Sequence, residues 1–444
     1  MNKTLLKNAS VINEMRIDTL DVLIKGAHIE KIAPDISDGT AAIIDLQGDY
    51  LLPGVIDDQV HFREPGLTHK GNIASESRAA VAGGITSYME QPNTNPQTTT
   101  ITKLEAKFEI AAKASYANYS FLFGGTNDNL EELKRLDKKS CSGIKLFLGS
   151  STGNMLVDDE VVLERIFKST DMVISAHCED EETIKRNFAA YHERYGAAIP
   201  IKYHPLIRSE KACILSSSKA IALAKKTGAR LHVFHVSTGA ETDFFRNDIP
   251  LEQKKITAEV CTHHLWFADE DYDAKGTLIK WNPAVKTASD RDRLWNALLD
   301  DRIDVLATDH APHTLAEKEN PYTKAPSGGP LVQHALPAMF QKHREGKISL
   351  EKMVEKMCHN PAKLFQIEKR GFIREGYFAD LVQVSPKATW TVTKDNILYK
   401  CGWSPFEGTN FDSKVTRTFV NGHLAYDKGL FSNVKKAKRL TFNR

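Results

Sequence analysis

Residues 55–62 read VIDDQVHF, an apolar run that is closed by polar side chains. Seven comparable runs follow, at residues 84–93, 118–125, 143–149, 172–180, 230–237, 256–264 and 304–313. Helical segments separate most of them, for example ITKLEAKFEIAAKAS at residues 101–115. Eight strands that alternate with helices predict an α/β fold of the TIM (β/α)8 barrel type, with a doubly wound open sheet as the alternative.

The chain on both sides of these runs has the pattern of β-strands. Residues 4–12, 19–33 and 41–52 are rich in β-branched residues between polar or glycine turns, and residues 370–385 and 414–429 repeat this pattern. We therefore predict two domains. A small β-sandwich domain would be built from both termini, residues 1–52 and 371–444, and the barrel would occupy residues 53–370.

The composition excludes several classes of function. A formal net charge of +2 over 444 residues creates no strong field toward nucleic acid or an anionic membrane. The sequence has no apolar run of about 18 residues that could span a bilayer. The six cysteines are scattered, and the N-terminus lacks the apolar run of a signal peptide. We expect a cytoplasmic protein that acts on a small molecule, with neither nucleic acid nor membrane as a partner.

Polar residues gather where the active site of a TIM barrel lies, at the C-terminal ends of the strands. The positions concerned are Gln59, His61, Arg63, Asn93, Lys145, His177, His235, Asp309 and His313. The first three are spaced by two residues, so they point to the same side of a strand. The nitrogen and oxygen donors of His61, His177, His235 and Asp309 are of the kind that bind zinc or manganese. Their shared position predicts a metal centre.

Several of these residues have a second interpretation. Lys145 either reaches a carboxylate or solvent, or carries carbon dioxide as a carbamate that bridges two metals. Arg63 either binds a substrate carboxylate or forms a structural ion pair. His310 could orient Asp309. The remaining histidines near the strands are expected to pack or to support the ligands, and they are His69, His204, His232, His263 and His264.

Long motifs of this sequence resemble those of dihydroorotases. They include PGVIDDQVHFREPG at residues 53–66, AEVCTHHL at 258–265 and ATDHAPHT at 307–314, and the resemblance runs essentially end to end. It implies the reversible cyclisation of N-carbamoyl-L-aspartate to L-dihydroorotate in pyrimidine biosynthesis. It also implies one or two Zn²⁺ ions and an attacking metal-activated hydroxide, with Asp309 as general base and then general acid.

The resemblance further implies roles for individual residues. His61, Lys145, His177, His235 and Asp309 would hold the metal. Arg63, supported by Asn93, would bind the substrate carboxylate. The ring would be contacted by Asn282 and His313 and by the backbone of Ser327 and Gly328. A homodimer and an association with aspartate transcarbamoylase are the expected assemblies.

Two positions depart from the family pattern. Gln59 stands where the family has its first metal-binding histidine, and an amide oxygen is a weaker zinc ligand than imidazole. The loop at residues 149–155 reads GSSTGNM and lacks the bridging aspartate of some bacterial relatives, so Lys145 is the expected bridge. Two other functions stay open. One is a related ring opener, such as a dihydropyrimidinase, hydantoinase or allantoinase, and the other is a catalytically silent scaffold. Residues 317–329 are long and polar enough to form a mobile loop over the pocket.

Overall fold

The computed structural model describes residues 3–149 and 155–444, and its centre is a parallel eight-stranded sheet in which each strand pairs with its neighbour in the chain. The strands are β6 (Val55–Val60), β7 (Ile85–Glu90), β8 (Asn118–Gly124), β9 (Gly143–Phe147), β10 (Val173–His177), β11 (Arg230–Val233), β12 (Ile256–Cys261) and β13 (Val305–Ala307). A parallel bridge between Val60 and His310 brings the first strand to the segment after the last. The sheet is thus nearly closed, which confirms the predicted barrel over the open sheet.

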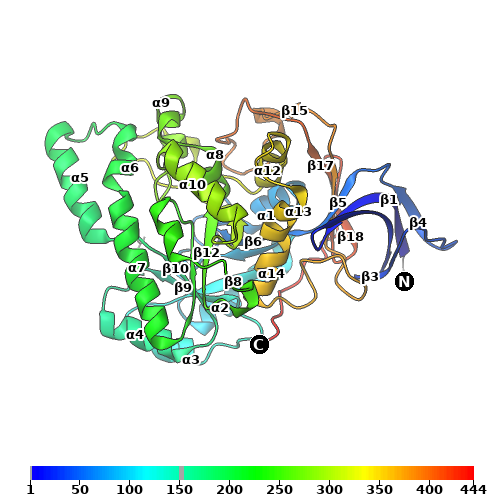
Figure 1. The fold of residues 1–444 in the computed structure, drawn as a ribbon, viewed down its shortest axis with the longest axis horizontal. Helices are drawn as coiled ribbons and strands as arrows, with labels where there is room; N and C mark the ends of the chain where they lie inside the picture. The colour runs from blue at the N-terminus through cyan, green and yellow to red at the C-terminus, as the bar shows by residue number, and fades with distance from the viewer. Residues whose placement is uncertain (1–2, 150–154) are drawn as a thin grey trace.

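Helices surround this barrel (Figure 1). They are α1 (Ile73–Ala82), α2 (Ile101–Ala114), α3 (Leu130–Lys134), α4 (Glu160–Ser169), α5 (Glu181–Tyr195), α6 (His204–Ile207), α7 (Glu210–Thr227), α8 (Thr262–Trp266), α9 (Tyr272–Lys275), α10 (Ala288–Leu299), α11 (Leu315–Lys318), α12 (Ala335–Arg344), α13 (Leu350–Val354) and α14 (Asn360–Phe365). The ends of α7 show how the sequence sets these limits. The Ser209 side chain accepts a hydrogen bond from the backbone N–H of Ala212, and Gly228 ends the helix in the left-handed conformation.

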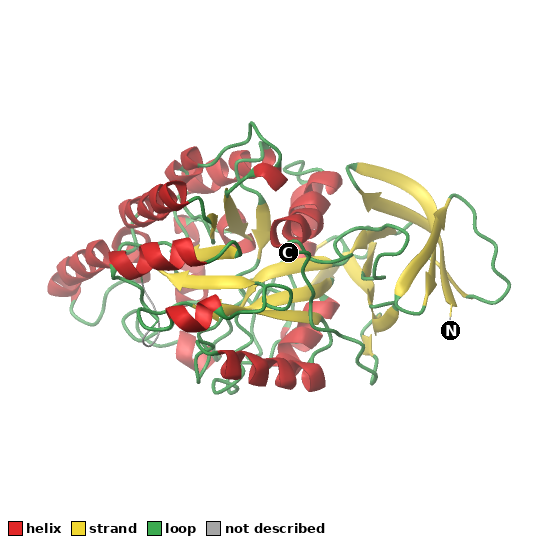
Figure 2. Cartoon of the chain, turned by 90° about the horizontal axis from the view of Figure 1, so that it is seen from below, coloured by secondary structure: helices red, strands yellow, loops and turns green. Residues whose placement is uncertain are grey.

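The strands of both termini form one mixed sheet beside the barrel (Figures 1 and 2). Its main order is β19-β18-β17-β14-β5-β1-β2-β3, with β4 paired to β1. The N-terminal strands are β1 (Lys3–Asn13), β2 (Arg16–Lys25), β3 (His28–Ala33), β4 (Ala42–Asp45) and β5 (Tyr50–Pro53), and the C-terminal ones are β14 (Leu381–Ser385), β17 (Lys414–Val420), β18 (His423–Asp427) and β19 (Leu430–Phe431). The predicted union of the two termini is confirmed, whereas the exact domain limits stay a prediction.

Buried polar contacts join the terminal sheet to the barrel. The side-chain amide of Asn118, in β8, donates to Asp380 at 3.1 Å. Its carbonyl oxygen accepts from the amide of Asn421 at 2.7 Å. The end of the chain then returns along the barrel, where the N–H of Leu440 donates to the carbonyl of Tyr119. The small hairpin of β15 (Trp390–Thr391) and β16 (Asn410–Phe411) also packs its aromatic side chains into the main core.

The barrel strands are buried on both faces, because helices cover the outside and side chains fill the inside. Every residue of β6, β7, β8, β9 and β10 is buried. This burial explains why the strands read as continuous apolar runs rather than as alternating ones. Within residues 3–149 and 155–444, every helix is too short or too polar to cross a lipid bilayer.

Candidate active site

A cavity of about 250 Å³ opens at the C-terminal ends of the barrel strands. All of the residues that the sequence singled out line it, namely Gln59, His61, Arg63, Asn93, Lys145, His177, His235, Asn282, Asp309, His313, Ser327 and Gly328. Phe147, Trp281, Ala311 and Pro326 complete the lining. The structure therefore brings together residues that are spread over more than half of the chain. Part of the loop after Lys145, residues 150–154, lies outside the described residues.

Three of the lining residues have a left-handed backbone although none is glycine. The φ angles are 71° at Arg63, 39° at His235 and 48° at Asp309. Residues with a side chain rarely adopt this conformation, and it is retained mainly where the surrounding structure requires it. Each of the three follows a barrel strand and turns its side chain into the cavity.

Gly66 explains how the segment that carries Arg63 reaches its place. This glycine has a φ of 84°, and a Cβ there would lie 1.9 Å from the backbone oxygen of Asn95. The loops after β6 and β7 consequently approach each other more closely than any other residue would allow. Asn93, on the second of these loops, thereby comes within 2.8 Å of His61.

His177 and His235 form a pair in which two ring nitrogens face each other. His177 Nδ1 lies 3.0 Å from His235 Nε2, and both side chains are buried. The other nitrogen of His177, Nε2, lies 2.9 Å from the Glu179 carboxylate, which also pairs with Arg208. Burial opposes the charge of Glu179, but Arg208 and His177 together lower its pKa to about 2. An ionised Glu179 accepts the His177 Nε2–H and leaves the Nδ1 lone pair directed at His235.

His61 stands across the cavity, between an amide and a carboxylate. Its Nδ1 lies 2.8 Å from the side-chain oxygen of Asn93, and its Nε2 lies 3.3 Å from Asp309 Oδ1. Because the side-chain oxygen of Asn93 can only accept, Nδ1 carries the proton and Nε2 carries the lone pair in the neutral ring. Burial lowers the pKa of His61 to about 4, so the ring is neutral at pH 7. Asn93 thus orients His61 in addition to lining the cavity.

Lys145 projects from β9 among aromatic rings rather than toward an acid. Its Nζ lies 4.1 Å from the ring centre of Phe234 and 5.0 Å from that of Phe147. Burial lowers the pKa of this amine to about 8. About a tenth of the amine is therefore uncharged at pH 7, far more than for an ordinary lysine, and the uncharged form is the one that can react with carbon dioxide.

Arg63 is a buried cation that pairs with no carboxylate of the described residues. Its Nε donates to the carbonyl of Pro312 at 3.0 Å, and its Nη2 lies 3.0 Å from His313 Nε2. Among the described residues, no carboxylate lies within ion-pair distance of its guanidinium, whose pKa burial lowers to about 10. The structural ion pair that the sequence left open is therefore wrong.

His313 fixes the loop that closes the cavity. Lys70 Nζ lies 3.0 Å from its Nδ1, and the backbone oxygen of Ser327 lies 3.0 Å from its Nε2. A lysine ammonium and an arginine guanidinium only donate, and a neutral ring accepts at one nitrogen, so the ring accepts either from Lys70 at Nδ1 or from Arg63 at Nε2, but not from both. Gly328 follows with a φ of 126°, and a Cβ there would lie 2.5 Å from the backbone oxygen of Ala311.

His310 does not orient Asp309. Its Nε2 lies 2.9 Å from Glu76, and its Nδ1 accepts the backbone N–H of Leu331 at 2.9 Å. Both ring nitrogens of His310 thus have partners other than Asp309, and the suggested orienting role is wrong.

Gln59 lies at the cavity, and the expected weakening of one ligand position there stays a prediction. Its side-chain oxygen lies 3.8 Å from the thiol of Cys261. An amide side chain carries no charge, and its oxygen is a weaker metal ligand than the nitrogen of a histidine ring. The other residues of the predicted donor set, which are His61, His177, His235, Lys145 and Asp309, still fit a metal ion. They offer three neutral imidazoles, an amine with a lowered pKa and a carboxylate around one cavity.

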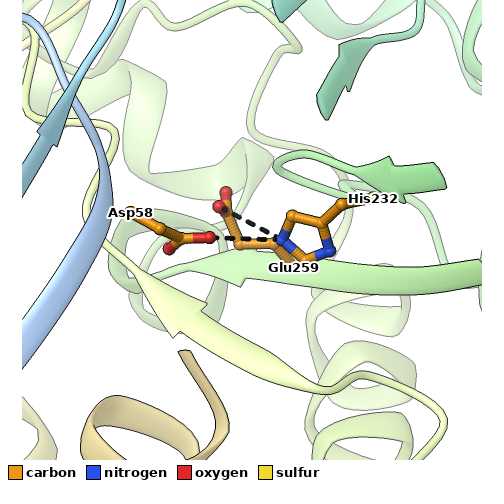
Figure 3. A group of neighbouring side chains, drawn as sticks. All are labelled: Asp58, His232 and Glu259. Carbon is orange, nitrogen blue, oxygen red and sulfur yellow. Dashed lines mark ion pairs between the residues drawn. The ribbon is translucent and has the colours of Figure 1, made fainter. Parts of the chain in front are cut away.

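A second group of potential ligands lies inside the barrel and was not found from the sequence. Asp58 in β6, His232 in β11 and Glu259 in β12 turn toward one another (Figure 3), and none of them lines the cavity. Their nearest ligand atoms lie within 4.8 Å of one another and are fully buried, so the group could hold a metal ion. His232 was expected to pack or to support the ligands of the cavity, and Asp58 and Glu259 were not singled out.

The family model described as the amidohydrolase family matches residues 50–425. The chain belongs to the amidohydrolase family. This amidohydrolase is 34% identical to a dihydroorotase from Halobacterium salinarum, over 92% of this chain and 93% of that protein. It is 33% identical to a dihydroorotase from Carboxydothermus hydrogenoformans, over 96% of this chain and 98% of that protein. The predicted kinship with dihydroorotases is confirmed, and the chain is a dihydroorotase-like cyclic amidohydrolase.

Solved structures show the same fold in other ring openers. An L-hydantoinase (dihydropyrimidinase) from Arthrobacter aurescens superposes with a TM-score of 0.94 at 27% identity, and each chain is covered completely. A dihydropyrimidinase from Brevibacillus agri superposes with a TM-score of 0.89 at 25% identity, again over both whole chains. The barrel with its terminal sheet is thus common to this chain, the hydantoinase and the dihydropyrimidinase.

Proposed function

We propose that this amidohydrolase is a dihydroorotase, which interconverts N-carbamoyl-L-aspartate and L-dihydroorotate. The observation that supports this substrate is Arg63, a guanidinium in the cavity wall that lacks an anionic partner among the described residues. A buried cation is stable only when an anion or several acceptors compensate it. The carboxylate of dihydroorotate would supply the missing charge through paired hydrogen bonds. The rings of dihydrouracil and hydantoin carry no such group.

His61, Lys145, His177, His235 and Asp309 would hold the metal, with Gln59 as a weak additional donor. When bound, a zinc ion supplies Lewis acidity, which polarises a carbonyl and lowers the pKa of water. Lys145 would contribute as a carbamate, and its lowered pKa favours that reaction. The convergence of His177 Nδ1 and His235 Nε2 at 3.0 Å supports a shared ion.

Asp309 would move the proton of the reaction. In the hydrolytic direction, oxygen from water bonds to the ring carbonyl carbon, and the carbon–nitrogen bond of the ring breaks. Asp309 accepts the proton that the water loses and gives it to the departing ring nitrogen. In the synthetic direction the ureido nitrogen bonds to the carboxyl carbon and loses its proton to Asp309, which would pass the proton to the departing oxygen, so that water leaves. Asp309 is placed for this because it lines the cavity beside His61.

The remaining lining residues would hold the ring in register with Asp309. Arg63 and Asn93 would bind the carboxylate from one side. Asn282, whose side-chain oxygen has no hydrogen-bond partner within the described chain, would accept from a ring N–H. The backbone of Ser327 and Gly328 would cover the ring, and the contact of His313 Nε2 with the backbone oxygen of Ser327 at 3.0 Å would position that backbone.

The test is the loss of L-dihydroorotate absorbance with purified, zinc-supplied protein, with dihydrouracil in parallel. We expect turnover of dihydroorotate and little of dihydrouracil. Preference for dihydrouracil would make the chain a dihydropyrimidinase, and inactivity toward both, with zinc and bicarbonate present, would support a silent scaffold. The cytoplasmic location, the homodimer and the association with aspartate transcarbamoylase stay predictions.

A further inference from the structure

The group of Asp58, His232 and Glu259 lies in the interior of the barrel (Figure 3). The side chains of all three are completely buried. They come from three different strands, so the group exists only when the barrel is formed. Since none of them lines the cavity, an ion held there would be separate from the substrate.

The atoms that face one another are the unsatisfied ones. Both oxygens of Asp58, Oε2 of Glu259 and Nε2 of His232 have no hydrogen-bond partner within residues 3–149 and 155–444. The other carboxylate oxygen of Glu259 is used, because it accepts the backbone N–H of His235 at 3.0 Å. Buried polar atoms are almost always hydrogen-bonded, so four free ones at one point indicate a missing partner.

The tautomer of His232 shows that the missing partner of these atoms must be a group that accepts electron pairs. Thr257 donates its hydroxyl to the carbonyl of Leu231 at 3.3 Å. The same hydroxyl oxygen lies 2.8 Å from His232 Nδ1 and must therefore accept from it. In the neutral ring the proton is thus on Nδ1, and Nε2 presents a lone pair toward Asp58 and Glu259. Two carboxylates and the Nε2 lone pair are all acceptors, so they cannot form hydrogen bonds with one another.

The spacing suits a metal ion. Nε2 of His232 lies 3.3 Å from Asp58 Oδ2 and 3.9 Å from Glu259 Oε2. Ligands at about 2.0–2.2 Å from a tetrahedral zinc are about 3.4 Å apart. The first of these separations already matches and the second requires a shift of about half an ångström. The third, between the two carboxylates, lies within 4.8 Å. A divalent cation would neutralise both carboxylates, whereas a single proton would leave one of them charged in the interior.

We propose that Asp58, His232 and Glu259 form a second metal site, which binds a divalent cation of the zinc or manganese class in a structural role. The ion would hold Glu259, and Glu259 in turn fixes the backbone of His235 at its left-handed turn. The site thus supports the cavity from below without contacting substrate. This inference does not depend on which cyclic substrate the enzyme hydrolyses.

The experiment counts metal in the full-length chain by mass spectrometry, after removal of metals and reloading with zinc alone. We expect Asp58→Asn to retain about one zinc ion per chain fewer than the wild type. Asp57→Asn is the matched control, because Asp57 is an equally buried neighbour that is hydrogen-bonded to Thr308. It should retain the wild-type count. His177→Asn should lose zinc from the cavity and keep the ion that Asp58→Asn loses.

An unchanged zinc count in Asp58→Asn would overturn the proposal and leave a shared proton as the explanation. If that variant does not fold, crystals of the zinc-loaded wild type decide the question. Anomalous scattering at the zinc edge should give a peak between Asp58 Oδ2 and His232 Nε2, and the absence of a peak there would also overturn the proposal. Failure of the dihydroorotase assay would affect neither result.

Discussion

The ammonium of Lys318 donates to the carbonyl oxygen of Gly328 at 2.7 Å, from a position without solvent exposure. The same ammonium donates to the carbonyls of Lys280 and Pro326. Lys280 in turn donates through its own side chain to the carbonyls of Tyr322 and Ala325. Two buried cations thus hold the segment of residues 317–329 by its backbone, which opposes the mobility expected from its composition.

We expect Lys318→Met to loosen this segment and raise KM for dihydroorotate about tenfold with a smaller change in kcat. The reason is that the carbonyls of Pro326 and Gly328 lose this donor, at about 1–3 kcal/mol for each group left unsatisfied, whereas that of Lys280 still accepts the backbone N–H of Gly328. Lys324→Met is the control, because Lys324 lies in the same segment but is exposed. Steady-state kinetics and limited proteolysis give the answer. Equal KM values and equal cleavage of the two variants would show that the clamp does not position the loop.

Arg63→Gln should lower kcat/KM for dihydroorotate about 100-fold and leave the slow turnover of dihydrouracil unchanged. The loss corresponds to about 3 kcal/mol, the value of charge-assisted hydrogen bonds to a carboxylate. Arg63→Lys keeps the positive charge but lacks the planar guanidinium group. Its kcat/KM for dihydroorotate should lie between those of the wild type and Arg63→Gln. The measurement is the rate with both substrates. A parallel loss for dihydroorotate and dihydrouracil would assign Arg63 to the structure rather than to carboxylate binding.

Asp309→Asn should lower kcat by at least about 1,000-fold, because an amide cannot accept and return the proton. The fold should persist, since the side chain is at the cavity and not in the hydrophobic core. Turnover of zinc-loaded protein and a thermal melt monitored by circular dichroism test both parts. Near-normal turnover of a folded variant would remove Asp309 from proton transfer.

The metal-site candidates could be predicted because they lie in or just beyond apolar strands, whereas Asn282, Ser327 and Gly328 were implied only by the resemblance. In a parallel barrel the ends of such strands meet at one mouth, so His61, His177 and Asp309 are neighbours as soon as the fold is known. The local geometry could not be predicted. Whether Arg63 meets an acid depends on the path of loops that are distant in the chain, and only the structure excluded that acid.

The interior group illustrates a different limit. Strands buried on both faces lack alternation, so the sequence does not tell which side chain of VIDDQV points inward and which lines the mouth. Asp58 and Gln59 are adjacent, yet only Gln59 reaches the cavity. The meeting of Asp58 with His232 and Glu259 depends on the stagger of three strands, and one sequence contains no signal for it.

Glu179→Gln should weaken zinc binding at the cavity by about 10- to 100-fold. The amide can still contact His177, but without a charge it no longer strongly favours the tautomer that leaves Nδ1 free. Glu182→Gln is the control, because Glu182 is an exposed acid three residues further along. Competition with a chromogenic chelator measures the affinity without reference to turnover. Equal zinc affinity in both variants would separate Glu179 from the metal site.

His334 should make the fold sensitive to acid, far from the chemistry. Burial lowers the pKa of this ring to about 3, from an ordinary value of 6.5. Between these values the unfolded chain binds a proton that the folded chain does not, so the stability present above pH 6.5 is lost as the pH falls toward 3. At pH 4.5 the loss should be on the order of 2 kcal/mol.

His334→Asn keeps a polar group beside Tyr399 and Ser404 but cannot titrate. Urea unfolding at pH 7.5 and 4.5 should therefore show a smaller decrease in the free energy of unfolding for the variant. If the two proteins lose the same free energy, His334 is protonated in the folded state, and its ring must have an acceptor that these two hydroxyls do not provide.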